Sequence, residues 1–253
     1  MRPVLRSVLV ALVLTTNADA QRGERYEEPG DNPAYDGRYT FARIRYDLGD
    51  GGFFRRGRGG DNRPPWAHDY PRGERNFTQI LAELTAVRTR TEESVVLSLI
   101  DPELFKYPVA YMSEPGFWRA SDAEAVALGA YLKKGGFILF DDFRENDWFN
   151  LVEQMRRALP DHRWVQIDGT HQIFDSFYRI EHPETLFSYG GTQPSFWVLF
   201  EANDPKKRII ALANRDNDLS EVWEWSGTGQ YPVDITNEAY KIGINYIIYA
   251  LSR

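Results

Sequence analysis

The chain has 253 residues, of which 42% are hydrophobic and 26% are charged, and it contains no cysteine. This composition is close to the globular average and excludes collagen-like, fully disordered and disulfide-scaffold proteins. The formal charge of −7 disfavours general binding to nucleic acid or to anionic membranes. A chain of this length fits one large domain that buries a sizeable core without a metal or a crosslink.

The first twenty residues have the three-part layout of a secretory signal. Basic Arg2 and Arg6 precede a short apolar run over 7–14, and the small-residue pattern Ala18-Asp19-Ala20 follows. The apolar run is well short of the ~20 residues that a membrane span needs. We therefore expect residues 1–20 to be a cleaved signal peptide and the protein to be exported, periplasmic or secreted, with no membrane span after signal removal.

Two segments near the N-terminus are rich in polar residues and glycine. Residues 21–37 predict a flexible leader, so a single domain is expected over 38–253. Residues 49–64 contain six glycines and four arginines and predict a flexible surface loop, with a basic lid over an anionic ligand as the alternative.

Hydrophobic patterns between these segments and the middle of the chain predict strands that alternate with helices. Alternation over Tyr39–Tyr46 predicts the first strand. Apolar residues from Phe77 to Leu84 at helical spacing predict a core-facing helix with Asn76 as its N-cap. Short apolar runs predict strands over 94–100 and 109–112, joined by a turn or short helix from Asp101.

The second half of the chain continues the alternation and then changes. Ser121 and Glu124 form a capping box that opens a helix ending at Gly135. The continuous apolar run Phe137–Phe140 predicts an inner parallel strand covered on both faces. A helix from Trp148 closed by Pro160, a strand over 164–167, a hairpin over 196–201 and 209–214, and a final helix over 238–251 follow. The predicted fold is α/β, a three-layer doubly wound mostly parallel sheet with a C-terminal antiparallel hairpin and helix.

Several motifs occur in chain order: Asp69-Tyr70-Pro71, Tyr111 to Gly116, Asp141-Asp142-Phe143, His171 to Phe174, and Gly243 to Tyr246. Together they resemble a bacterial family known as domain of unknown function 4159, over nearly all of the chain from about residue 38. That family resembles the class I glutamine-amidotransferase-like fold, a doubly wound flavodoxin-type sheet. No activity is established for the family as a whole, so the resemblance implies a fold and not a reaction.

The candidate catalytic residues are Asp141, Asp142 and His171. The two aspartates follow the inner strand, at the edge where open parallel sheets bind ligands, and strand alternation predicts that only one faces the crevice. They are interpreted either as a helix cap and an arginine partner, or as a general base or hard-metal ligand. His171 is interpreted as the base that they orient, or as a loop histidine bonded to backbone. The absence of cysteine excludes the thiolate chemistry of true amidotransferases.

The candidate ligand-binding residues are Arg43, Arg45, Glu114, Trp148 and Asn214. Arg43 and Arg45 share one face of the first strand. They are interpreted either as a structural ion network with Asp141, Asp142 or Glu114, or as ligands of a carboxylate or phosphate group.

Two further features are interpreted as parts of the surface. Residues 214–218 match a calcium loop poorly and predict a solvated turn. Trp66 is expected to be exposed.

These observations predict a non-catalytic exported binding or interaction domain, because no complete catalytic set is present. The alternative is a hydrolase that uses Asp141 or Asp142 with His171 on an anionic or carbohydrate-like substrate, with or without a metal. The four histidines show no paired ligand spacing, so no metal site and no cofactor are predicted. The expected partner is a small molecule or a cell-envelope protein, and not nucleic acid.

Overall fold

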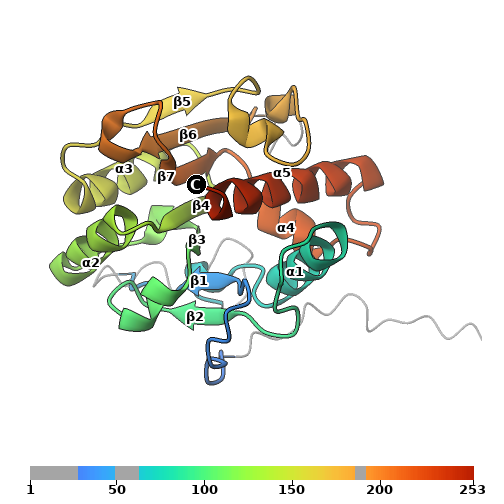
Figure 1. Ribbon diagram of the computed structural model, residues 1–253, viewed down its shortest axis with the longest axis horizontal. Coiled ribbons are helices and arrows are strands. Elements are labelled where there is room, and N and C mark those ends of the chain that lie inside the picture. The colour runs from blue at the N-terminus through green and yellow to red at the C-terminus, as the bar shows by residue number, and fades with distance from the viewer. Residues whose placement is uncertain (1–27, 49–62, 186–191) are drawn as a thin grey trace, which may run out of the picture.

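Seven strands form one mixed sheet at the centre of the computed structural model, which describes residues 28–48, 63–185 and 192–253 (Figure 1). The sheet order is β2-β1-β3-β4-β7-β6-β5. The strands are β1 (Ala42–Ile44), β2 (Val95–Leu97), β3 (Val109–Ser113), β4 (Phe137–Phe143), β5 (Val165–Ile167), β6 (Ser195–Phe200) and β7 (Ile209–Arg215). The helices are α1 (Arg72–Leu84), α2 (Asp122–Lys133), α3 (Asp147–Ala158), α4 (Leu219–Glu224) and α5 (Val233–Leu251).

The sheet is parallel on one side and antiparallel on the other. Strands β2, β1, β3, β4 and β7 run parallel, whereas β6 is antiparallel to β7 and β5 is antiparallel to β6. The predicted α/β class, with a mostly parallel sheet and a C-terminal antiparallel hairpin, is confirmed. The second hairpin strand, β7, completes the parallel part of the sheet beside β4.

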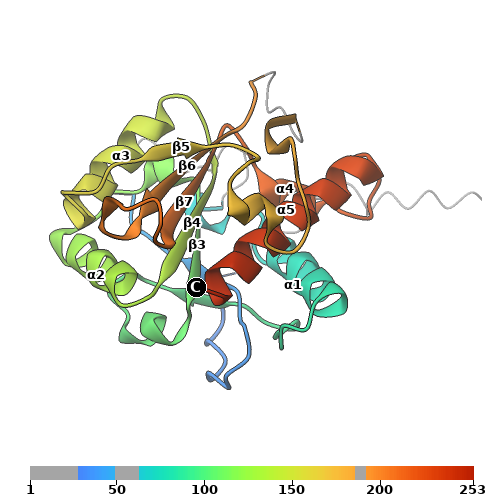
Figure 2. The same cartoon turned by 45° about the horizontal axis from the view of Figure 1, so that its top comes forward.

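Helices cover both faces of the sheet and make three layers (Figure 2). Helices α2 and α3 lie on one face, and α1, α4 and α5 lie on the other. Within β4, Ile138 and Phe140 belong to one buried cluster, and Phe137 and Leu139 belong to the other. Successive side chains of a strand point to opposite faces, so the continuous apolar run predicted for this strand serves two cores.

Several predicted element boundaries differ from the observed ones. The capping box of Ser121 and Glu124 is confirmed at the start of α2. Helix α1 begins at Arg72, four residues before the predicted N-cap Asn76, whose amide donates instead to the carbonyl of Trp223, 2.8 Å away. Helix α5 begins at Val233 rather than at 238, and α4 had not been predicted.

The N-terminal part of the described chain lies against the edge strand β2. The side-chain amide of Asn32 donates to the carbonyl of Val96 (2.9 Å) and accepts from its N–H (2.8 Å). Tyr35 packs edge-on against Tyr107, with ring centroids 5.4 Å apart. Residues 28–37, predicted to be a flexible leader, therefore contact the domain, while the predicted signal peptide over 1–20 and most of the glycine-arginine loop, 49–62, lie outside the described residues.

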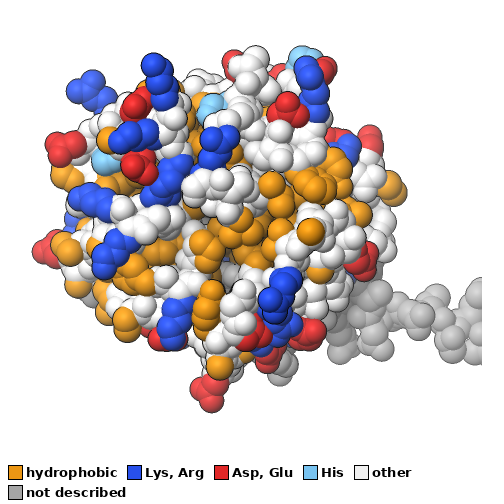
Figure 3. All heavy atoms as spheres, viewed as in Figure 1, with side chains coloured by type: hydrophobic (Ala, Val, Ile, Leu, Met, Phe, Trp, Pro, Cys, Tyr) orange, Lys and Arg blue, Asp and Glu red, His pale blue; other side chains and the backbone are white. Residues whose placement is uncertain are grey.

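The surface carries apolar side chains that the helical patterns had assigned to the core. Figure 3 shows hydrophobic side chains across the middle of the face seen in Figure 1, with charged groups around its rim. Leu84, predicted to belong to the apolar face of a core-facing helix, is 50% exposed, and Phe149 on α3 is 68% exposed. None of the helices in the described ranges is long and apolar enough to cross a membrane.

A buried ion pair joins β1 to α1. Arg43 Nε lies 2.6 Å from Oε1 of Glu74, and the two side chains are 0% and 1% exposed. The Nη1 of Arg43 also donates to the carbonyls of Trp66 and His68, each 2.9 Å away. Trp66 is buried rather than exposed, so that prediction is wrong.

The two arginines predicted to share one face and bind a ligand are therefore separated. Arg43 bonds through Nε and Nη1 to interior partners, none of which is Asp141, Asp142 or Glu114. Arg45 lies beyond the end of β1 and is exposed. The N–H of Arg45 still donates to the carbonyl of Leu97 (2.9 Å), but its side chain is exposed whereas that of Arg43 is buried.

Substitution Glu74→Gln tests the importance of this pair. Removing one partner leaves the Arg43 guanidinium buried without its counter-charge. We therefore expect the free energy of unfolding to fall by about 3–5 kcal/mol. Urea denaturation followed by circular dichroism measures the change. The matched substitution Glu153→Gln breaks an exposed pair with Arg156 and should leave the midpoint nearly unchanged; equal effects of the two substitutions would contradict the prediction.

Candidate metal centre

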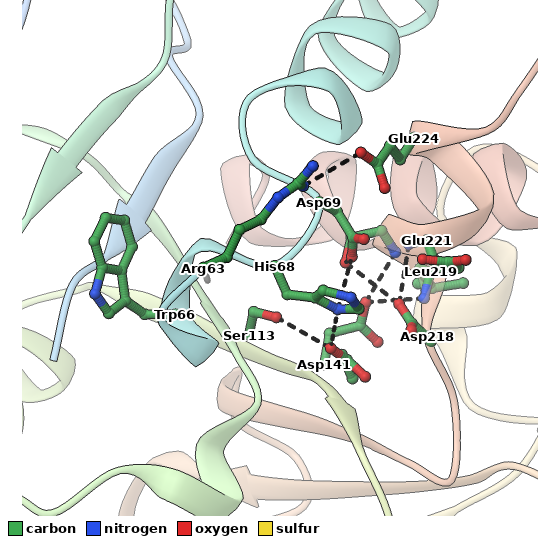
Figure 4. Close-up of polar contacts among 12 residues, drawn as sticks. Arg63, Trp66, His68, Asp69, Ser113, Asp141, Asp218, Leu219, Glu221 and Glu224 are labelled. Carbon is green, nitrogen blue, oxygen red and sulfur yellow. Dashed lines mark hydrogen bonds and ion pairs between the residues drawn. The ribbon is translucent and has the colours of Figure 1, made fainter. Parts of the chain in front are cut away.

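Four titratable side chains meet beyond the carboxyl ends of the parallel strands (Figure 4). His68 and Asp69 come from the connection between β1 and α1, Asp142 from the end of β4, and Asp218 from the turn between β7 and α4. One ligand atom from each lies within 4.8 Å of the others. We call this group the His68 cluster. Its position matches the edge predicted for Asp142 from the strand pattern.

Two of these carboxylates belong to residues with an unusual backbone conformation. Asp69 and Asp142 have φ of 63° and 55°, in the left-handed region that residues with a Cβ rarely adopt. The pairing of β4 with β7 also shifts register between Phe140 and Phe143. Strand alternation is therefore disturbed at this point, and of the two aspartates only Asp142 belongs to the His68 cluster. Such outliers concentrate at functional sites.

His68 is surrounded by carboxylates. Its Nδ1 lies 2.7 Å from Oδ2 of Asp142 and 3.6 Å from Oδ2 of Asp69, and its side chain is 15% exposed. Burial disfavours the charged ring, but attraction to Asp69 and the hydrogen bond to Asp142 outweigh it and raise the pKa of His68 to about 12. Without a metal, His68 is therefore an imidazolium that donates to Asp142.

Asp141 organises the backbone around the cluster. Its Oδ1 accepts from the Asn214 amide (3.0 Å), and its Oδ2 accepts from the N–H of Leu219 (2.9 Å) and lies 3.1 Å from the Tyr111 hydroxyl. Burial raises its pKa to about 7. The capping interpretation is thus supported for Asp141, although the helix that it caps is α4 rather than the next helix, α3. By holding the first turn of α4, Asp141 positions Asp218.

Some carboxylate oxygens of the His68 cluster have no hydrogen-bond donor facing them within the residues that the structure describes. Asp69 Oδ1 and Asp218 Oδ2 are buried and have no hydrogen-bond partner among the described residues. Burial raises the pKa of Asp69 to about 6 and that of Asp218 well above its usual range. Because an unpaired buried charge is costly, the cluster must take up protons or a cation.

The donor set fits a divalent transition-metal ion. Opposite ligand atoms around a cation lie about 4–5 Å apart when the metal–ligand bonds are about 2.0–2.5 Å long, which matches the spacing of the His68 cluster. One imidazole nitrogen with three carboxylates suits Mn²⁺, Fe²⁺ or Zn²⁺ better than Ca²⁺. The prediction of no metal site rested on the spacing of histidines in the sequence, and that spacing carries no information about a set at positions 68, 69, 142 and 218.

His171, the predicted catalytic partner, lies elsewhere. Its Nδ1 accepts from the N–H of Ile173 (3.2 Å), and its ring packs against Phe200 and Tyr249. The Tyr249 hydroxyl accepts from the N–H of Ile209 at the start of β7, so His171 is near the opposite end of that strand from Asp141. The structure does not bring His171 to the aspartates; it is the backbone-bonded loop histidine of the alternative interpretation, and His68 occupies the position predicted for it.

The other predicted ligand contacts have different surroundings. Glu114 is buried after β3, where its carbonyl accepts from the Tyr46 hydroxyl (2.7 Å). Trp148 is half-buried and packs against Phe143 and Trp197. Asn214 lies beside the predicted aspartates, because its side-chain amide donates to Asp141.

The turn after β7 is buried rather than solvated. Asp216, Asn217 and Asp218 are at most 5% exposed, and the Asp218 carboxylate accepts from the N–H of Glu221 as the N-cap of α4. Sequence analysis therefore missed His68, Asp69 and Asp218 as site residues. The Asp69-Tyr70-Pro71 motif was a usable signal, since it is one of the motifs shared with the resembled family.

Comparison with known proteins identifies the family. The family described as domain of unknown function (DUF4159) matches residues 40–251. The chain belongs to this family. No match to a curated protein was found. The DUF4159 region contains all four residues of the His68 cluster and every described strand.

The pH dependence of stability tests the buried charge in protein freed of metal by a chelator. Carboxyls whose pKa is raised on folding stabilise the fold at low pH and lose that contribution as the pH rises from about 4 to about 7. The pKa of His68 is also raised on folding, so its contribution to stability is likewise lost as the pH rises above about 6.5, the pKa of a histidine in the unfolded chain. We expect the melting temperature to fall by at least about 2–4 °C between pH 5 and pH 8, which corresponds to about 1 kcal/mol for a domain of this size.

Substitution Asp218→Asn provides the control, because it removes one of the carboxyls with a raised pKa and should flatten the fall. A melting temperature that rises over the same range would contradict the surplus of buried negative charge. Differential scanning calorimetry at constant ionic strength measures both proteins.

Proposed function

We propose that this DUF4159 chain is an exported domain that binds a divalent cation on a class I glutamine-amidotransferase-like scaffold. The order of the parallel strands, β2-β1-β3-β4-β7, supports the scaffold, because it follows the 2-1-3-4-5 order of flavodoxin-type sheets. The signal-like sequence over 1–20 supports export.

The His68 cluster carries the proposal of a cation site. Three buried carboxylates converge on one imidazole, and two of their oxygens lack a donor among the described residues. A divalent cation would take the place of the proton on His68 Nδ1 and satisfy those oxygens, since metal ligands bind in their deprotonated forms. Asp141 would not be a ligand, because both of its oxygens already accept hydrogen bonds.

A metal-dependent hydrolase is the second candidate, with His68 in place of His171 as the histidine of the site. The partial exposure of His68 supports it, because solvent and a small substrate would reach the cation from that side. Water polarised by the cation would then act as the nucleophile that the missing cysteine cannot provide. The substrate class stays as predicted from the sequence, anionic or carbohydrate-like.

Calorimetric titration of chelator-treated protein with Mn²⁺ and with Zn²⁺ at neutral pH tests the cation site. We expect saturable binding and a higher melting temperature for the wild type. Asp142→Asn should weaken binding at least about tenfold, because loss of a ligand should cost no less than the loss of an outer-shell partner.

Asp175→Asn is the matched control, since Asp175 is exposed and far from the His68 cluster along the chain, and it should bind like the wild type. Circular dichroism verifies that both variants fold. Wild-type protein that binds neither ion, or Asp142→Asn that binds as tightly as the wild type, would overturn the proposal.

A further inference from the structure

A second group of carboxylates adjoins the His68 cluster. Asp69, Glu221 and Glu224 each place one carboxylate oxygen within 4.8 Å of the others. Glu221 and Glu224 are three residues apart on α4, so they share one face of that helix, and Figure 4 shows both beside Asp69. Asp69 belongs to both groups.

The two oxygens of Asp69 have different surroundings. Oδ2 accepts from the Ser220 hydroxyl at 2.5 Å and faces His68 Nδ1 at 3.6 Å. Oδ1 is fully buried and has no hydrogen-bond partner in the described part of the chain. Among the described residues, Oδ2 therefore faces the His68 cluster and accepts a single hydrogen bond, and Oδ1 is left without a donor. A carboxylate that bridges two metal ions presents one oxygen to each.

The charge of the two groups together exceeds what one divalent cation neutralises. The groups contain five carboxylates, those of Asp69, Asp142, Asp218, Glu221 and Glu224. Arg63 supplies one positive charge, with Nη1 3.4 Å from Glu224. His68 is neutral when it coordinates a metal, so one divalent cation leaves a surplus of two negative charges, which is the charge of a second such cation.

We propose that Asp69 bridges two divalent cations, the first held also by His68, Asp142 and Asp218, and the second by Glu221 and Glu224. This inference rests on the proposed cation site and adds a second ion to it. Glu221 is partly exposed, so the second ion would be the more accessible and the more easily exchanged of the two. Paired ions about 3.5–4 Å apart are a recurring arrangement in hydrolytic metal centres.

Equilibrium dialysis of the full chain against Mn²⁺, combined with electron paramagnetic resonance, tests the bridge. The wild type should bind two ions per chain, and the spectrum should show exchange coupling between them. Glu221→Gln should bind one ion per chain with an uncoupled spectrum, because it removes a ligand of the second ion alone. Glu83→Gln, at an exposed position on α1, is the control and should keep two coupled ions.

The outcomes separate the two proposals. One ion per chain in the wild type, or two ions without coupling, overturns the bridge and leaves the cation site of the His68 cluster standing. Two coupled ions in Glu221→Gln overturn the assignment of the second ion to α4. A wild type without any bound Mn²⁺ overturns both proposals. The test does not depend on substituting buried Asp69, whose loss would also disturb folding.

Discussion

The site depends on the way the charge of the Arg43 guanidinium is neutralised inside the protein. A guanidinium keeps its charge at any ordinary pH, so its burial requires a counter-charge and several acceptors. Glu74 supplies the charge, and the carbonyls of Trp66 and His68 supply acceptors. The same contacts hold the turn before α1 over the carboxyl ends of the strands. The position of His68 and Asp69 is therefore a consequence of how the first strand neutralises its own arginine.

Around that turn, several acidic side chains are buried, although protein interiors seldom contain them. Asp141 shows how such a group is tolerated, because four donors from β3, β7 and α4 surround its two oxygens. Asp69 and Asp218 each have one oxygen without a donor among the described residues, although they are as deeply buried. This contrast between neighbouring carboxylates separates the structural acid from the acids that favour a cation. The left-handed backbone at Asp69 and Asp142 is consistent with the same division.

The sequence predicted features that depend on neighbouring residues and missed those that depend on distant ones. The Ser121 capping box and the strand from Phe137 are local patterns, and both are confirmed. Neighbouring residues do not show which histidine meets the aspartates, because His68 contacts an aspartate 74 residues further along the chain. The turn at Asp218 has the composition of a solvated loop and is buried only because α1 and the sheet cover it. Helix α4 has six residues, too few for a periodic pattern.

The contact of Asn32 with Val96 has a consequence for association between molecules. In β2, Val95 and Leu97 bond inward to the chain around β1, so the N–H and carbonyl of Val96 point outward from the sheet. A side-chain amide carries one donor and one acceptor, as a peptide group does, and Asn32 occupies both outward groups. An unpaired strand edge is a template for recruiting a strand from another chain. The N-terminal segment thus covers this edge strand and disfavours its pairing with a strand of another molecule.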